Sequence, residues 1–199
     1  MELLMAGIAL AVGAAASMYR RHRRLNPPAR KALAAVRHAP IAEFPDGGVG
    51  AIVGHVRYAG DELQAPLTQR VCAYYRVTIE SRLPGRDATR ESTEENGVDF
   101  YIEDDTGRAL VSIEHVEVVL ARDVETRLGS YGPERHCEGI LEDGERVVVF
   151  GRGYWSGDFA PQHGDSYRAP ARRLLTMRGS EREPLRISDD SALFSRAAR

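Results

Sequence analysis

The sequence is poor in the residues that build metal centres and disulfide frameworks. It has two cysteines, Cys72 and Cys137, and six histidines among 199 residues. A structural zinc site needs four ligands, usually with cysteines paired at short spacing. The two cysteines lie far apart in the sequence, and the histidines are scattered. We therefore predict no metal site and no cofactor.

The body of the chain also has no excess of positive charge. Residues 43–199 contain 28 acidic and 20 basic residues, a net charge of −8. Proteins that bind nucleic acid draw most of their affinity from Lys and Arg placed against phosphates. This balance argues against nucleic acid as a partner. Residues 3–42 have the opposite composition, with seven basic residues and no acidic one.

Long apolar runs are absent with one exception, at the N-terminus. Residues Leu3 to Met18 carry no charge, and a basic cluster follows at once. The cluster consists of Arg20, Arg21, Arg23 and Arg24. A membrane-spanning helix needs about 20 mostly apolar residues, with a lower limit near 17. The segment just reaches this length, and the cluster disfavours the alternative of a buried helix. We predict a transmembrane helix with a basic flank at residues 1–25.

The position of the basic cluster predicts the topology. A secretory signal peptide carries its positive charges before the apolar core, whereas here they come after it. Because Lys and Arg beside a span stay on the cytoplasmic side, we expect a single-pass protein with its N-terminus outside and its domain cytoplasmic. The arginines then face anionic headgroups, so the lipid bilayer is a predicted partner. Both cysteines are expected to be reduced, and a disulfide between them requires the opposite topology.

Beyond the basic cluster the pattern changes from helical to β-type. The predicted parts are a helical stalk and linker at residues 26–48, a β domain at residues 49–188 and a C-terminal tail at residues 189–199. Pro27 and Pro28 open the stalk helix, and prolines and glycines mark the linker. In the tail, Asp189 and Asp190 are candidate caps for a last helical turn.

Alternating apolar and polar residues predict short strands within the β domain. The predicted strands are residues 49–55, 71–81, 98–103, 109–113, 146–151 and 174–177, with an edge strand at 184–188. In the second strand we expect one core face, formed by Val71, Ala73, Tyr75, Val77 and Ile79. The acid-rich residues 82–97 are predicted to be a solvated loop.

The order of these elements favours a mainly β fold. We expect a small closed barrel of the oligonucleotide/oligosaccharide-binding (OB) type, with a segment at residues 61–97 inserted between its first two strands. The expected OB type describes the fold and implies no particular function, because one barrel fold supports many functions.

Several short motifs resemble one known family. They are Ala65-Pro66-Leu67-Thr68, Cys72 to Val77, Phe100 to Gly107 and Glu138 to Leu141, followed by Gly144, Val147, Val149 and Gly151. In this order they are similar to the GIDE domain, a module found beside the membrane in a mitochondrial RING-type ubiquitin ligase and in bacterial and archaeal membrane proteins. The resemblance covers about residues 49–188 and implies a protein of the bacterial type.

The resemblance does not carry ligase activity to any residue here. In the ligase, catalysis belongs to a C-terminal zinc-bearing RING, and this sequence has no cysteine after Cys137. A name taken from the family would suggest a ubiquitin transferase, and we expect no such activity. The family's usual second membrane helix has no counterpart after the predicted domain either.

The candidate binding residues are aromatic and charged side chains on the predicted strands and turns. They are Tyr74, Tyr75, Arg76, Tyr101, Asp104, Asp105 and Trp155. Aromatics with one polar end favour binding faces and membrane interfaces, and Tyr74 and Tyr101 form a recognition patch if both point outward. Trp155 and Phe159 are placed in a glycine-rich loop at residues 151–164. The turn residues Asp104 and Asp105 are expected to bond their own backbone, with cation binding as the alternative.

Three functions are consistent with these residues. The first is a non-catalytic, membrane-tethered interaction module that binds a protein or ligand at the cytoplasmic face. The second is an enzyme or carrier that uses Cys72 or His136, although no histidine lies close to Cys72 in the sequence. A third is an anchored barrel outside the cytoplasm that carries a small cofactor. We favour the first and assign no catalytic residue.

Overall fold

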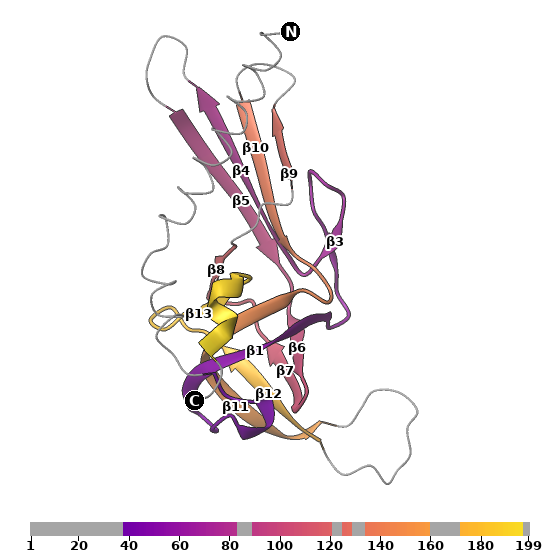
Figure 1. The fold of residues 1–199 in the computed structure, drawn as a ribbon, viewed down its shortest axis with the longest axis vertical. Coiled ribbons are helices and arrows are strands. Elements are labelled where there is room, and N and C mark those ends of the chain that lie inside the picture. Colours follow the sequence, from indigo (N-terminus) through magenta and orange to yellow (C-terminus); the bar gives the residue numbers. More distant parts are fainter. Residues whose placement is uncertain (1–37, 83–88, 121–124, 129–133, 160–171, 197–199) are drawn as a thin grey trace.

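The computed structural model describes residues 38–82, 89–120, 125–128, 134–159 and 172–196 (Figure 1). The predicted transmembrane helix, the basic cluster and the stalk helix lie outside these ranges. Within them, no helix has both the length and the apolar character needed to cross a membrane. The described chain is mainly β-sheet, with two short 3-10 helices, η1 (Ile41–Glu43) and η2 (Ser191–Arg196).

Five strands form a closed barrel, as the alternation predicts. They are β1 (Val49–Tyr58), β6 (Phe100–Asp104), β7 (Gly107–Val111), β12 (Arg172–Arg178) and β11 (Arg146–Phe159). Each pairs with the next in this order, and β11 pairs back with β1 to complete the ring. All of these pairs are antiparallel except β7 with β12, which is parallel. The barrel lies in the lower half of Figure 1.

The predicted hairpin is confirmed by the β6–β7 register. Phe100 lies opposite Val111 and Ile102 opposite Ala109, with all four side chains fully buried. The turn between the strands is held by Asp104. Its Oδ1 accepts hydrogen bonds from the backbone amides of Thr106 and Gly107 at 2.7 and 2.9 Å, because an aspartate at this position can replace backbone partners in a turn.

The barrel interior is a continuous apolar cluster that includes residues from before β1. Ile41 is fully buried and Phe44 is 3% exposed. The predicted linker is therefore wrong for these residues, because they close one end of the barrel. Gly54 marks a close approach of β1 to β6: a Cβ there would lie 2.5 Å from the carbonyl oxygen of Glu103. Only glycine fits such a contact without a backbone shift.

Two further strands, β13 (Leu185–Ser188) and β8 (Val116–Val119), extend the barrel sheet beyond β11. The strand predicted at residues 184–188 is confirmed as β13, but its predicted edge position is wrong, because β13 pairs with β11 on one side and β8 on the other. Its buried Leu185 and Ile187 suit this inner position. The expected cap is present: the Asp190 carboxylate accepts a hydrogen bond from the Ala192 amide at 3.0 Å, at the start of η2.

A second sheet of four strands projects from the barrel (Figure 1). Its strands, in spatial order, are β5 (Thr89–Gly97), β4 (Tyr74–Arg82), β10 (Glu134–Leu141) and β9 (Glu125–Leu128). The predicted solvated loop at residues 82–97 is wrong over β5, which pairs with β4 along its whole length. Polar side chains are tolerated there because the described side chains of Glu91 to Asn96 are exposed.

The strand predicted at residues 71–81 is interrupted at Ala73, and its predicted core face is only partly right. β3 (Val71–Cys72) pairs with β2 (Leu63–Gln64) beside the main sheet, and β4 starts afterwards. Val71 is 44% exposed, whereas Tyr74 on the other face is 3% exposed. Both faces of this strand are buried near the barrel, because Tyr74 packs into the barrel cluster and Tyr75 into a second small cluster.

The predicted glycine-rich loop at residues 151–164 is wrong in its first half. β11 continues to Phe159 and pairs with β12 along this stretch, with a register shift after Ser156. Trp155 is therefore a strand residue that lies opposite Leu175. Residues 160–171 lie outside the described part of the chain.

Candidate functional site

A cleft of about 1060 Å³ opens between η1, the β6–β7 hairpin and the neighbouring ends of β11 and β12. Four of the seven candidate binding residues line it: Tyr101, Asp104, Asp105 and Trp155. Three of them belong to the β6–β7 hairpin, and Trp155 belongs to β11. The fold thus brings together, at one end of the barrel, side chains that the sequence analysis selected singly.

Hydrogen bonds between side chains and backbone fix the walls of the cleft. Asp104 Oδ2 accepts a hydrogen bond from the Ile41 amide at 2.9 Å, so one carboxylate holds both the hairpin turn and η1. The indole Nε1 of Trp155 donates to the carbonyl oxygen of Phe44 at 2.8 Å, and its backbone amide donates to Asp46 at 2.9 Å. Trp155 is therefore held in place against the segment that precedes β1.

The cleft is more acidic than basic. Its charged residues are Glu43, Asp46, Glu103, Asp104, Asp105, Arg108 and Arg173. The carboxylates of Glu43 and Asp105 are exposed and make no hydrogen bond or ion pair with any residue that the structure describes. Asp104 acts as the structural acid of the turn, so two carboxylates at the rim remain available to a bound cation.

Two of the three aromatic rings of the cleft already face a cation. The guanidinium of Arg108 lies 5.0 Å from the centroid of the Tyr101 ring, and that of Arg173 lies 5.6 Å from the Trp155 ring. Such distances are typical of cation–π contacts. Arg108 and Arg173 are themselves exposed, so an incoming group can displace them at low cost.

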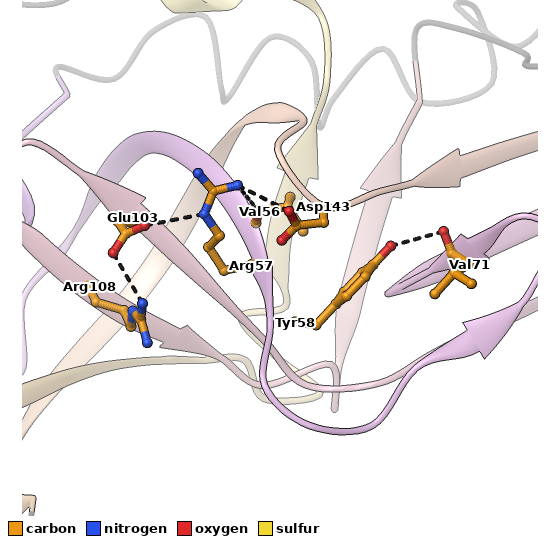
Figure 2. Close-up of polar contacts among 7 residues, drawn as sticks. All are labelled: Val56, Arg57, Tyr58, Val71, Glu103, Arg108 and Asp143. Carbon is orange, nitrogen blue, oxygen red and sulfur yellow. Dashed lines mark hydrogen bonds and ion pairs between the residues drawn. The ribbon is translucent and has the colours of Figure 1, made fainter. Parts of the chain in front are cut away.

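A chain of ion pairs leads from two cleft residues, Arg108 and Glu103, to Arg57 and Asp143 outside the cleft lining (Figure 2). Arg57 donates from Nε to Glu103 at 3.2 Å, and Glu103 accepts from Arg108 at 3.1 Å. Arg57 also pairs with Asp143 in the β10–β11 turn at 3.3 Å. The hydrogen bonds from Arg108 and then Arg57 lower the pKa of the Glu103 carboxyl below its ordinary value. Beside this chain, the Tyr58 hydroxyl donates to the Val71 carbonyl at 2.9 Å and ties β1 to β3.

The other three candidate residues lie on β4, away from the cleft. Tyr74 is buried, so the expectation that it points outward with Tyr101 is wrong. Its hydroxyl donates to Glu95 at 2.7 Å, and burial raises its pKa. Arg76 pairs with Glu95 and donates to the carbonyl oxygen of Val118 at 2.6 Å, linking β4 to β8. Tyr75 is 9% exposed and donates to Glu94 at 3.2 Å.

The cysteines are both buried free thiols in the structure. Cys72 is fully buried, and desolvation together with the nearby Glu138 raises the pKa of its thiol to about 11. A thiol with this pKa is protonated at neutral pH and a poor nucleophile. Among the residues that the structure describes, no three His, Cys, Asp or Glu side chains lie close enough to hold a metal ion together.

Several cleft residues were missing from the sequence-based set. They are Glu43, Phe44, Asp46, Glu103, Arg108 and Arg173. Glu103 and Tyr101 share a face by strand alternation, and this signal was present in the sequence. Nothing in the sequence indicated that residues 41–46 fold back against a hairpin about 60 residues later, a contact visible only in the fold.

Two comparisons with known proteins were negative. No protein-family model matches the chain, and no curated protein matches it. The structure itself defines a closed β-barrel domain with an acidic, aromatic cleft at one end.

Proposed function

We propose that this chain is a non-catalytic interaction module that binds a positively charged protein segment or ligand in the cleft at the barrel end. The observation that carries the proposal is the composition of the cleft. Two rim carboxylates, Glu43 and Asp105, have no partner among the described residues, and two aromatic rings beside them already accept guanidinium groups. This combination suits Lys, Arg or another organic cation.

The topology supports an OB-type barrel. β1, β6 and β7 follow one another around the ring, and β11 returns beside β1, which is the Greek-key order. OB folds bind their ligands on the face of the second and third barrel strands, here β6 and β7, and the cleft lies on this face. Its acidic lining is the reverse of what phosphate binding needs, so the proposed partner is basic rather than a nucleic acid.

The order of motifs supports assignment to the GIDE type, without a ubiquitin-transferase activity. Within the described residues, the Leu67–Thr68 motif and Glu138 are in direct contact. The Glu138 carboxylate is fully buried and accepts hydrogen bonds from the Leu67 and Thr68 amides at 2.7 and 3.0 Å. Two motifs that are 70 residues apart thus serve one structural purpose, which is a physical reason for them to occur together.

We propose a non-catalytic role because no nucleophile is activated in the described part of the chain. The thiol of Cys72, one basis of the enzyme alternative, is buried and has a raised pKa. His136, the other, is half-buried on β10 and lies opposite Ile79, outside the cleft.

The cleft can be tested through its own fluorophore, because Trp155 is the single tryptophan of the chain. Titration of the full-length protein in detergent with a pentalysine peptide is expected to change Trp155 emission in a saturable way. The double variant Glu43→Lys/Asp105→Lys should bind roughly tenfold more weakly, since it replaces two attractive charges with repulsive ones. Neither carboxylate bonds to the described fold, so folding is preserved.

The matched control is Asp61→Lys/Glu62→Lys, which changes the same charge at two exposed residues outside the cleft. It should bind pentalysine like the wild type, and pentaglutamate should bind to neither protein. If both double variants weaken binding equally, the attraction comes from net charge alone and the cleft assignment is wrong.

The membrane tether is a separate part of the proposal and rests on the apolar run and the basic cluster. After cell breakage, the full-length chain is expected to sediment with membranes and to enter solution with detergent. Leu10→Arg should weaken this association, because a charge at the centre of a span costs about 2.5–3.5 kcal/mol on insertion scales. Recovery of the wild-type chain as freely soluble protein without detergent would refute the tether.

A further inference from the structure

The outer edge of β5 is an open strand edge. β5 pairs with β4 in one continuous antiparallel register, from Tyr74 opposite Gly97 to Arg82 opposite Thr89. Among the residues that the structure describes, no strand pairs with its other side. In Figure 1, β5 forms one border of the projecting sheet.

The backbone groups that point outward from β5 can be assigned from the ladder. The Val98 amide donates to the Ala73 carbonyl at 2.9 Å, so the backbone amide and carbonyl of Val98 point inward, towards the neighbouring chain segment. Inward and outward residues alternate in an antiparallel strand, which leaves Thr93 and Glu95 with outward amides and carbonyls. Gly97 fits this alternation, because its amide is taken by the Asn96 side chain at 2.9 Å.

Natural edge strands are protected by prolines, charged side chains, bulges or short length. β5 is nine residues long, contains no proline and keeps its register throughout, so its protection comes from its charged side chains, three glutamates and one arginine. Its other residues are polar apart from Gly97, and only the two threonines favour strands. A polar sequence keeps an exposed strand soluble without blocking its backbone, which is the combination that addition of a further strand requires.

We propose that β5 is a docking edge that binds an extended, lysine- or arginine-rich segment of a partner protein as an added β-strand. The charge of β5 selects this occupant. Its sequence, Thr-Arg-Glu-Ser-Thr-Glu-Glu-Asn-Gly, has three glutamates and one arginine. Arg76 of β4 pairs with Glu95, and the edge keeps a net negative charge with this arginine counted. Opposite charges on adjacent strands stabilise a sheet, and like charges directly opposite destabilise it.

A second copy of this chain is a poorer occupant. An antiparallel pairing of two β5 strands centred on Thr93 would place Glu91 opposite Glu95 twice, once on each side of the symmetry axis. Four carboxylates would then form two like-charge pairs. The inference does not depend on the cleft, because β5 contributes no residue to it.

The test uses the full-length protein in detergent and a short fluorescent peptide in which lysine alternates with threonine. Anisotropy is expected to show saturable binding, and hydrogen exchange at the Thr93 and Glu95 amides should slow on binding. Thr93→Pro removes an outward amide and leaves the inward ladder intact, since proline is tolerated at an edge. It should weaken binding by roughly tenfold, whereas Thr93→Val, which keeps the amide, should not.

Modified peptides keep the test decisive if Thr93→Pro disturbs the sheet. A peptide methylated on alternate backbone nitrogens cannot complete a ladder and should lose binding to the wild-type protein. A glutamate version should bind at least tenfold more weakly than the lysine version. The same titrations are run on the cleft variant Glu43→Lys/Asp105→Lys, which removes binding of the peptide in the cleft. This variant should still bind the lysine peptide, and exchange at the Thr93 and Glu95 amides should slow as in the wild type.

Four results would overturn the proposal. These are no binding of the lysine peptide, equal binding of the methylated peptide to the cleft variant, equal binding of the glutamate version to that variant, or loss in that variant of both the binding and the slowed exchange. The last result would place the peptide in the cleft and leave the proposed function standing.

Discussion

In the barrel, every strand is paired on both sides, whereas the projecting sheet ends in β5 and β9, which each have one partner among the described residues. The barrel surrounds a single apolar cluster of fully buried side chains. The sheet has a smaller cluster on one face, under β2 and β3. Closure and a large interior make the barrel a support, and the open edge leaves the sheet available for pairing.

The two regions also handle polar groups differently. The barrel keeps its carboxylates at the rim, where Asp104 holds the hairpin turn and η1. The sheet buries one, Glu138, and satisfies it with two backbone amides. A buried charge persists only with such partners. The small apolar cluster of the sheet therefore depends on a polar contact that the barrel interior does not need.

The largest difference should appear on truncating an apolar side chain in each region. Phe100 is fully buried in the barrel, and Phe100→Ala is expected to lower the free energy of unfolding by about 3–5 kcal/mol. Ile79 is half-buried in the sheet. Ile79→Ala should lower the free energy of unfolding by about 1 kcal/mol, because shortening a half-buried side chain leaves little or no cavity. Urea unfolding measures both. Equal losses would mean that the sheet is as tightly packed as the barrel.

The buried carboxylate gives the next largest effect. Glu138→Leu removes the acceptor of the Leu67 and Thr68 amides and is expected to cost about 2–3 kcal/mol, since both donors are left without a partner. Glu138→Gln keeps one acceptor oxygen and should lose less. The measurement is urea unfolding together with hydrogen exchange at the two amides. An unchanged exchange rate at Leu67 in Glu138→Leu would contradict this role.

The same contrast explains which parts of the fold could be predicted from sequence. The β6–β7 hairpin alternates strictly and carries an Asp-Asp-Thr-Gly turn, so its residues and its turn were both predicted. β5 is a strand of Glu, Ser, Thr and Asn with no apolar face, and it was predicted as a loop. Its partner β4 supplies the backbone hydrogen bonds, and a partner strand leaves no periodicity in the sequence of an exposed edge.

The candidate site was predicted only in part for a related reason. Tyr101, Asp104, Asp105 and Trp155 were chosen by residue type, and the fold places all four in one cleft. Tyr74 was chosen by the same criterion, but the sequence does not show that its ring packs into the barrel cluster and that its hydroxyl bonds to Glu95 of β5. Glu43 was missed because its segment has the composition of a linker, and only its contacts with the hairpin make it part of a wall.

Acid pH should weaken the barrel at the point where the chain enters it. His38 is 8% exposed, and neither ring nitrogen has a hydrogen-bond partner among the residues that the structure describes. Burial and then the Arg146 charge lower its pKa below 6.5. As the pH falls, His38 takes up a proton in the unfolded state at a higher pH than in the folded state. Its neutral form therefore costs no stability above about pH 6.5, and the free energy of unfolding decreases as the pH drops from there towards the folded-state pKa.

Unfolding in urea at a series of pH values between 7 and 5 tests this expectation. The wild type should lose stability across the window, and His38→Phe, which cannot take up a proton, should lose less. Glu103 does not interfere, because its pKa is lowered from 4.5 and its contribution is lost only at more acidic pH. Parallel curves for the two proteins would show that His38 does not carry the pH dependence.

The smallest effect is expected for the ion pairs that connect the cleft residue Glu103 with Arg57 and Arg108. Arg57 and Glu103 are 38% and 40% exposed, and solvent screens pairs of this kind. A double-mutant cycle with Arg57→Ala and Glu103→Ala should give a coupling free energy of about 0.2–1 kcal/mol. High salt should reduce it further. A coupling well above this range would indicate that the wall is rigid and that Arg108, paired with Glu103, cannot leave the Tyr101 ring when a ligand enters. A small coupling fits a wall whose charges can rearrange around a bound cation while the closed barrel behind them stays unchanged.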